Sequence, residues 1–571
     1  MDKKTIALLV PLVLVIIFYW QILGFLGIVK PKPAAPPAAA VDTTQVAKDT
    51  TRPVQPAVTA DTGATTPSAP AAVSPLPVDT MKADSLTVAT KIYKVIMSSH
   101  GGGPVSLKLN HYALRNGAPI EILSDGKSAT PEVTYAGGTM SSSSLGYKCS
   151  LTPGTYDATT RPLSIDYTYT SPSGGELIRH FTFFPDSSHY QLVIEAKNRE
   201  KLGFDRQYSL VWNTPLGVTE PQPSTDYDAM EAVAMMANSR EQLKDFKNNK
   251  LNQSLTGTTT WAAVRNKYFA AIMIPRNKTA DGVTAVGDQF PKIDAEFGKF
   301  MERRLTIGLE LAISAAPQFA DTFSVFVGPL DYPLLAKYNV GLQDILGIGT
   351  MQYVGWIIKP FALMVIWLLP RMFSVFGNYG VVIILFALLV KLVTLPLSLK
   401  SMRSMNAMKE LQPKLEELKK RLKNKPQDLN AETMRLYKEH GVNPLSGCFP
   451  MLAQMPLFFA LFSVFRSTIL LRNAPFVWFI TDLSRGAIGF LDPYMILVVL
   501  MVVFQFVSQI LSMPSNQQNK FMYYLMPLIF AFFFYKLAAG LVLYWTCFSL
   551  FTIGDYYIFR RQKKNAEVKT L

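Results

Sequence analysis

Lys391 lies in the middle of an otherwise uncharged apolar run, YGVVIILFALLVKLVTLPLSL, at residues 379–399. A charge at that depth in a membrane costs about 2.5–3.5 kcal/mol, so we expect a functional reason for it. The alternative is snorkelling of the side chain toward headgroups near Lys400, roughly 13 Å away along a helix. We identify no Asp or Glu in the later apolar runs to neutralise Lys391. We therefore expect an unpaired cation in a wet cavity, where it would attract acidic or polar segments.

Polar side chains recur inside the later apolar runs, where they could line the same cavity. The run 441–465 contains three prolines, which should kink it, and the amide of Gln454. Another run contains a polar-aromatic cluster at 544–546, for which anchoring at the membrane interface is the alternative interpretation. The candidate cavity residues are Lys391, Thr394, Gln454, Tyr544, Trp545 and Thr546.

Residue types that bind metals or perform covalent chemistry are scattered along this chain. The three cysteines are far apart and form no CxxC pair, and the five histidines show no ligand spacing. A glycine cluster within 98–109 is not followed by a helical pattern, so we interpret it as a strand bend and not as a phosphate-binding loop. We therefore expect no metal, no cofactor and no catalytic residue.

The composition indicates a membrane protein with several domains. The chain has 571 residues, of which 49% are hydrophobic, and a net charge of +15. The mean hydropathy is +0.18, and the apolar residues crowd near the N-terminus and beyond residue 350. Basic charge beside apolar runs first suggests membrane orientation and anionic lipid, and not sequence-specific nucleic acid.

The N-terminal region is predicted to be an anchor followed by a tether. Residues 5–29 carry no charge, and this run is longer than the usual core of a signal peptide. We favour an uncleaved transmembrane anchor at 1–29 with its N-terminus inside, and a cleaved signal peptide is the alternative. Residues 30–88 hold ten prolines among Ala, Thr and Ser, a composition typical of a disordered tether.

Residues 89–332 are predicted to form an all-β domain. Short runs rich in β-branched and aromatic residues alternate with Gly, Pro, Asn and Asp. This pattern is typical of a β-sandwich or barrel. The predicted strands lie within 180–196, 206–214, 267–275, 303–314 and 321–330.

Charge between the apolar runs predicts their orientation. Residues 399–442 contain eleven Lys or Arg against six Asp or Glu, and the tail from Arg560 has five against one. Both segments therefore belong in the cytoplasm. This requires an anchor and five core spans, which we place at 379–399, 443–466, 494–513, 520–536 and 537–555. The segment 351–376 is then predicted to be an amphipathic helix on the outer face, although its apolar composition also permits a span.

The cytoplasmic segment 399–442 is predicted to be a helical hairpin within a five-helix core at 379–560. Met and Leu residues form one apolar stripe along it, and KNKPQD at 423–428 supplies the turn. The hairpin is either an ordinary solvated helix pair or an adaptable contact surface. The candidate contact residues of the hairpin are Lys409, Lys414, Lys419, Lys420, Arg421 and Lys423. The basic tail is placed at 561–571, and the candidate contact residues at this end of the chain are Arg560, Arg561, Lys563 and Lys564.

Several motifs in order resemble the YidC–Oxa–Alb family of membrane insertases. These are LLVKLVTLPLS (388–398), KELQPKLEELKKRL (409–422), GVNPLSGCFPMLAQMPLFFALF (441–462), NAPFVWFITDLS (473–484), DPYMILVVLM (492–501) and MPLIFAFFFYKLAAGLVLYW (526–545). The resemblance covers about 351–562 strongly. The N-terminal part more weakly resembles the anchor, tether and periplasmic β-supersandwich of the long Gram-negative form.

The resemblance implies a multi-domain polytopic protein of the bacterial inner membrane, with six transmembrane helices. Its five-helix core would hold a hydrophilic groove that accepts nascent hydrophobic segments and releases them into lipid, alone or with the SecYEG translocon. Lys391 stands where the family usually has an arginine, which keeps the charge but loses the planar fork. Implied partners are nascent membrane proteins, SecYEG, the ribosome, signal-recognition machinery and anionic lipids. Both termini would be cytoplasmic and the β domain periplasmic.

Three other classes of function compete with insertion. A folding or assembly scaffold without insertion activity is the nearest. A small-solute transporter should show internal repeats, which we do not find. A membrane-anchored enzyme or glycan-binding module would depend on the β domain, whose spacing reveals no catalytic dyad.

Overall fold

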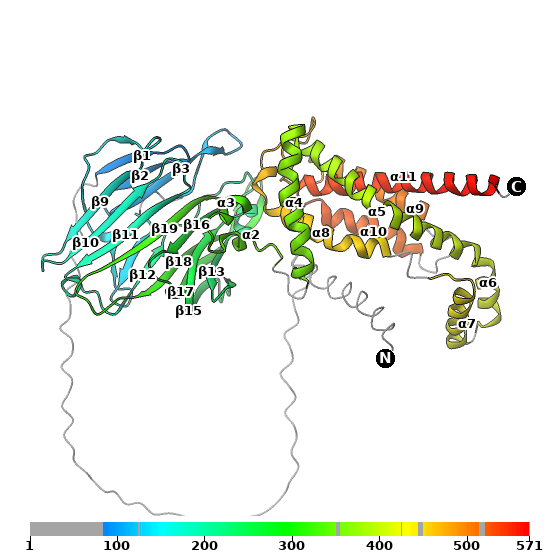
Figure 1. Cartoon of the computed structure of the whole chain (residues 1–571), viewed down its shortest axis with the longest axis horizontal. Coiled ribbons are helices and arrows are strands. Elements are labelled where there is room, and N and C mark those ends of the chain that lie inside the picture. Colours follow the sequence, from blue (N-terminus) through cyan, green and yellow to red (C-terminus); the bar gives the residue numbers. More distant parts are fainter. Residues whose placement is uncertain are drawn as a thin grey trace, which may run out of the picture. The chain divides into compact units, whose positions relative to one another are not determined.

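The computed structural model describes residues 84–123, 126, 128–349, 354–423, 425–443, 449–512 and 520–569. The predicted anchor at 1–29 and the predicted tether as far as residue 83 lie outside these residues. The described chain contains a β-rich domain followed by a helical region (Figure 1).

The β domain is built from two largely antiparallel sheets. The smaller sheet has the order β4 (Pro119–Glu121), β3 (Gly103–Ala113), β2 (Tyr93–Ser98), β1 (Ser85–Ala89) and β8 (Thr155–Asp157), with β1 and β8 parallel. The larger sheet has the order β6 (Met140–Ser141), β5 (Glu132–Tyr135), β12 (Gln207–Trp212), β18 (Gly298–Ala312), β17 (Ala280–Asp294), β15 (Lys250–Arg265), β16 (Phe269–Pro275), β19 (Phe319–Pro329), β11 (His189–Lys197), β10 (Glu176–Phe183), β9 (Leu163–Thr170) and β7 (Lys148–Cys149). A hairpin of β13 (Glu231–Met236) and β14 (Ser239–Leu243) pairs with β15. The predicted sandwich is confirmed.

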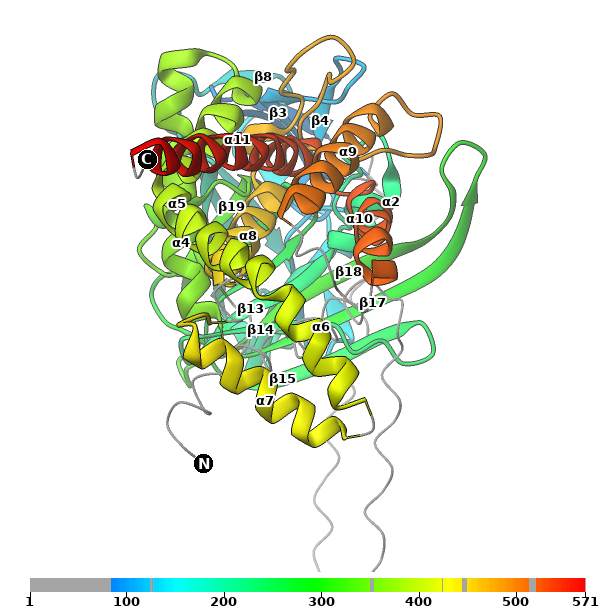
Figure 2. The ribbon, with the colours of Figure 1, turned by 90° about the vertical axis from the view of Figure 1, so that its right-hand side faces the viewer.

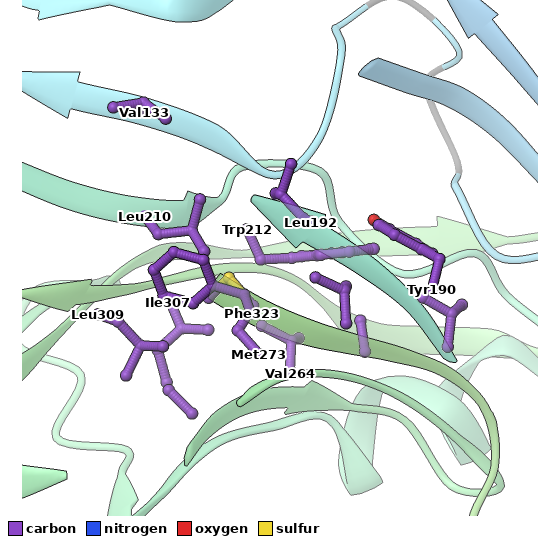
Figure 3. Packing of buried hydrophobic residues seen from close by; sticks show 14 of the residues in the cluster. Val133, Tyr190, Leu192, Leu210, Trp212, Val264, Met273, Ile307, Leu309 and Phe323 are labelled. Atoms are coloured by element: carbon purple, nitrogen blue, oxygen red, sulfur yellow. The ribbon is translucent and has the colours of Figure 1, made fainter. Parts of the chain in front are cut away.

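Alternation of apolar residues decides which face of a strand is buried. In β11, HYQLVIEAK, every second side chain is buried, beginning with Tyr190 and Leu192. Figure 3 shows these two residues packed near Trp212 of β12 and near Phe323 of the neighbouring strand β19. β16, in contrast, is a continuous apolar run with six consecutive buried residues, as expected for a strand covered on both faces. One buried cluster contains side chains from both sheets, so the two sheets share a core.

The domain begins earlier than predicted. β1 starts at Ser85, inside the range 30–88 that we assigned to the tether, and Leu86 and Val88 are buried. The last proline of the tether is Pro77, so nothing prevents the following residues from joining the sheet.

The predicted bend at the glycine cluster is confirmed. Gly101 and Gly102, between β2 and β3, have φ values of +77° and +57°. A Cβ on either residue would also lie 2.7 Å from Ala129 or from the Tyr147 ring. Glycine is therefore required here by both backbone conformation and close packing.

Two short helices precede the helical region. α2 (Pro223–Ala229) lies between β12 and β13, and α3 (Tyr332–Ala336) follows β19. The elements of the helical region are α4 (Gly355–Phe376), α5 (Tyr379–Glu410), α6 (Gln412–Arg421), α7 (Pro426–Glu439), α8 (Phe449–Ser467), α9 (Met495–Ser512), α10 (Lys520–Phe534) and α11 (Ala539–Lys569). α11 packs against α5 and α9, and it also contacts α8 (Figure 2). α5, α8, α9, α10 and α11 correspond to the five predicted core helices. α5 continues to Glu410, inside the range 399–442 predicted for the hairpin, and α6 and α7 lie in the rest of that range.

Three helices in the described part of the chain are long and apolar enough to cross a membrane: α4, α5 and residues 539–560 of α11. The apolar stretches described within α8 and α9 are shorter. The count of six spans stays a prediction.

α4 corresponds to the segment predicted to lie on the outer face. Figures 1 and 2 show it running across the direction of α11. Ile358, Ala362 and Val365 face inward, whereas Trp356 and Trp367 are exposed. The exposed face also carries two basic side chains, Lys359 and Arg371, and Arg371 lies 4.0 Å from the Trp367 ring. The interfacial position of α4 stays a prediction, which the exposed Trp and basic residues on one face support.

Candidate functional site

Lys391 is buried and forms an ion pair. Its Nζ lies 2.7 Å from Oδ2 of Asp555, and the two side chains are 6% and 4% exposed. The expectation that no carboxylate would neutralise Lys391 is therefore wrong. We treated residue 555 as the inner end of the last span, but α11 continues to Lys569, and its packing against α5 brings Asp555 beside Lys391.

Three further side chains surround this pair. Thr552 Oγ1 accepts a hydrogen bond from Lys391 Nζ over 2.9 Å, and the Phe548 ring centroid lies 4.7 Å from the same nitrogen. Ser398 donates to Oδ2 of Asp555 over 2.7 Å. The charges are thus paired and hydrogen-bonded, which a buried ion pair requires to offset its desolvation.

Gln454 and Tyr544 form a second polar contact inside the helical region. The Gln454 Nε2 donates to the Tyr544 hydroxyl over 2.7 Å, which links α8 to α11. Tyr544 also stacks on Phe548 at 6.0 Å, so it continues the same face of α11 that carries Thr552 and Asp555. The spacing of four, four and three residues along 544, 548, 552 and 555 keeps these side chains on one face.

Trp545 belongs to a third polar contact, between α11 and α9. Its Nε1 donates to Gln505 Oε1 over 3.2 Å, and Ser549 donates to the same oxygen over 2.8 Å. The Trp545 ring packs near Phe458 and Phe534, at 5.2 and 5.7 Å. An amide in the apolar run of α9 was the signal that could have identified Gln505 from the sequence.

The two threonines among the predicted cavity residues bond within their own helices. Thr546 donates to Val542 O over 2.7 Å, and Thr394 donates to Val390 O over 3.0 Å. Thr546 is buried, and Thr394 is half-buried. Neither of them joins the ion pair.

Among the predicted cavity residues, Lys391, Gln454, Tyr544 and Thr546 are buried, whereas Thr394 and Trp545 are half-buried. The exposed fraction is 5% for Lys391, 8% for Gln454 and 0% for Tyr544. A cavity of about 340 Å³ lies between α5, α9 and α11 and is lined by Met402, Met405, Asn406, Lys409, Leu511, Tyr556, Phe559 and Arg560. Lys409 and Arg560, predicted as separate contact residues, are thus brought to one cavity.

The other predicted basic residues lie on the hairpin and the tail. Lys420, Arg421 and Lys423 are exposed, and Lys419 is half-buried. Lys414 Nζ lies 3.0 Å from Nε2 of His440, which joins α6 to the end of α7. Arg561, Lys563 and Lys564 belong to α11, and the structure does not describe their side chains.

The described residues hold no group of three or more His, Cys, Asp or Glu side chains arranged to bind a metal ion. The chemistry that the site offers is hydrogen bonding and ion pairing inside an apolar environment. Both strengthen as water is excluded.

Two family models together match most of the chain. One is described as the YidC periplasmic domain and matches residues 85–364, and the other, as the 60Kd inner membrane protein, matches 371–567. The membrane protein insertase YidC of Chlorobium luteolum is 31% identical over 84% of this chain and 82% of its own length. The chain belongs to the YidC family. The resemblance drawn from the motifs is confirmed.

Two further proteins named YidC are similar to this chain. The membrane protein insertase YidC of Syntrophus aciditrophicus is 29% identical over 98% of this chain and all of its own length. A solved structure, described as an active YidC insertase with the first transmembrane domain resolved, is 20% identical with a TM-score of 0.35. The matched region covers 85% of this chain and 95% of the chain in that structure.

Proposed function

We propose that this chain is an insertase that moves newly made hydrophobic segments into the bacterial inner membrane. The observation that carries the proposal is the buried pair Lys391–Asp555, held between two apolar helices of a YidC family member. Buried ionisable groups within apolar helices are costly and mark functional sites. The Gln454–Tyr544 bond supplies a second polar position in the same helical region.

In this mechanism, the hydrophilic part of a nascent segment exchanges hydrogen bonds with the polar side chains of α5, α8 and α11. Because Asp555 neutralises Lys391, the site offers a polar surface with no uncompensated charge. The apolar part then leaves for lipid, which releases about 0.8 kcal/mol for each buried CH₂ group. That transfer drives the step, so the mechanism requires no nucleotide or metal.

The proposed orientation follows the distribution of charge. The basic hairpin and the tail lie in the cytoplasm, the β domain lies in the periplasm, and α4 lies along the outer face. With an anchor at 1–29, both termini are cytoplasmic. The exposed residues Lys420, Arg421 and Lys423 would contact the ribosome, signal-recognition machinery or anionic lipid, and the core would work alone or beside SecYEG.

Insertion by the purified protein tests this function. The full chain is reconstituted into liposomes and supplied with a single-span substrate, and protection of the inserted segment from protease is measured. An insertase protects the segment in proportion to its own amount, with empty liposomes as the control. A folding or assembly scaffold would leave protection at the level of empty liposomes.

A further inference from the structure

Asp555 occupies the place beside Lys391 that an acidic residue of a substrate would need. We propose that Asp555 is a displaceable counter-ion, which competes with carboxylates of the inserted segment for Lys391. Asp555 would thereby set how strongly the protein prefers acidic segments. This inference rests on the proposed insertase function and names the residue that tunes its specificity.

The geometry leaves Lys391 able to begin the exchange. An ammonium group has three N–H donors. Two of them are used, by Asp555 Oδ2 at 2.7 Å and by Thr552 Oγ1 at 2.9 Å. Within the described ranges the third donor has no hydrogen-bond acceptor, so a second carboxylate can bind before the first one leaves.

The 340 Å³ cavity supplies an approach to the pair. Met402, which lines it, follows Ser398 by four residues on α5, and Phe559 follows Asp555 by four residues on α11. The cavity therefore begins about one helical turn from the ion pair, on the same helix faces. Its volume lies within the range of roughly 300–1,000 Å³ that is common for binding pockets.

The charges along this approach favour an acidic segment. Lys409 and Arg560 both line the cavity, and Lys391 lies beyond them. A carboxylate would meet these two cations first and then replace Asp555 at Lys391. The buried ammonium keeps a partner throughout, which avoids the cost of an unpaired buried charge.

Because of this exchange, we expect the natural protein to discriminate only weakly between acidic and neutral substrates. One carboxylate replaces another, so the acidic substrate gains little over a neutral one. Without Asp555, the same substrate would supply the charge that Lys391 lacks. Removing Asp555 should therefore sharpen the preference for acidic segments.

Two single-span substrates that differ by one Asp-to-Asn change in the translocated segment test the proposal. Their insertion into proteoliposomes is compared for the parent and Asp555→Asn. We expect the parent to favour the acidic substrate by no more than about twofold and Asp555→Asn to favour it by roughly tenfold. Asp428→Asn, at an exposed residue of α7, is the matched control and should behave as the parent does.

An unchanged ratio in Asp555→Asn, with both substrates inserted, overturns the exchange. If that variant does not fold, Ser398→Ala decides, because it removes one of the two described bonds to Asp555 Oδ2. It should raise the acidic preference a few-fold, and a ratio equal to the parent's would contradict the proposal. Failure of the parent to insert either substrate would instead contradict the insertase function.

Discussion

Gln454 donates a hydrogen bond to Tyr544 over 2.7 Å, across 90 positions of sequence, and the two side chains join α8 to α11. In the sequence they lie in two separate apolar runs, Gln454 alone and Tyr544 within the polar-aromatic cluster at 544–546. Their exposed fractions are 8% and 0%, so water has little access to either side chain. The bond gives the Gln454 amide an acceptor and the Tyr544 hydroxyl a donor. The contact therefore joins two core helices, and in the proposed mechanism it is also a polar position for a substrate.

Tyr544→Phe tests the structural part of this contact. The substitution keeps the ring that stacks on Phe548 but leaves the Gln454 amide without its acceptor. We expect a loss of about 1 kcal/mol in the free energy of unfolding in detergent, as for other hydrogen bonds between membrane helices. Gln454→Leu combined with Tyr544→Phe should recover part of the loss, because it removes the orphaned amide as well. Additive losses in the double variant would contradict the pairing.

Neutralising Lys391 alone should destabilise the protein more than neutralising both members of its ion pair. Lys391→Met leaves Asp555 buried and unpaired, which we expect to cost about 3–5 kcal/mol in the free energy of unfolding. Lys391→Met with Asp555→Leu removes both charges and should return most of that stability. Denaturant unfolding of the parent, the single variant and the double variant measures the difference. Equal stability of the two variants would show that the pair does not form in the membrane protein.

Insertion by Lys391→Glu does not test whether Lys391 attracts acidic substrates, because Asp555 lies beside the substituted residue. The substitution would place a second carboxylate against Asp555, so lost insertion would report repulsion within the protein as much as repulsion of the substrate. The charge-swapped variant Lys391→Asp with Asp555→Lys keeps one charge of each sign. It should fold about as stably as the parent, and its unfolding midpoint compared with that of Lys391→Glu checks this.

The sequence was sufficient to predict the helices of the core and several strands of the β domain, but not the contacts between distant elements. β11 was predictable because its alternating pattern matches the two-residue period of a strand with one buried face. The helix boundaries near residues 379 and 495 follow from where the apolar runs begin. The Lys391–Asp555 pair could not be predicted, since it depends on how α5 packs against α11.

The errors at residues 85 and 555 have different physical causes. At Ser85 the tether composition was extended too far, although the prolines end at Pro77. At Asp555 a charged residue was taken as the end of a span, whereas a helix continues past a charge that has a partner. Neither cause is a failure of the hydrophobic pattern itself.

Arg179 should be essential to the stability of the β domain. The guanidinium is fully buried, and it donates to the carbonyl oxygen of Gly101 over 2.6 Å and to that of Pro131. Burial lowers the pKa of Arg179, since water no longer solvates its charge. Arg179→Leu would leave both carbonyls without this donor, and we expect a loss of about 3 kcal/mol in the free energy of unfolding of the domain.

Arg161→Leu is the control for this substitution, because Arg161 is an exposed residue of the same domain. It should change the free energy of unfolding by no more than about 0.5 kcal/mol. Thermal unfolding of the full chain, followed by near-ultraviolet circular dichroism, measures both variants. Equal effects of the two substitutions would show that the buried contacts of Arg179 do not stabilise the domain.

Excising the β domain should leave much of the insertion activity. The strands run from Ser85 to Pro329, and the short helix α3 follows, so replacing 85–349 by a flexible linker removes the sheets without leaving exposed strand edges. The polar contacts of Lys391 and Gln454 lie entirely among the later helices. Insertion into liposomes by the shortened protein measures the result. Complete loss of activity, with the core helices still folded, would favour a function carried by the β domain.

The β domain should lose stability as the pH falls below about 6.5, because His189 is held neutral in the folded state. Burial, assisted by Arg276, lowers the pKa of His189 to about 4, against about 6.5 in an unfolded chain. The Tyr338 hydroxyl lies 2.9 Å from its Nδ1, a geometry that suits an unprotonated acceptor. Between these two pKa values the unfolded chain binds the extra proton, so protonation favours unfolding.

This lowered pKa predicts that the free energy of unfolding falls by about 2 kcal/mol between pH 7 and pH 4.5, a figure discounted for the partial exposure of the ring. His189→Gln keeps a hydrogen-bond acceptor but does not titrate, so its unfolding should depend less on pH over the same range. Denaturant unfolding of parent and variant at half-unit pH steps measures the two slopes. Because the carboxylates of the domain contribute to both proteins, the difference between the curves isolates His189. Parallel curves from pH 7 to pH 4.5 would mean that His189 takes up its proton without any cost to the fold.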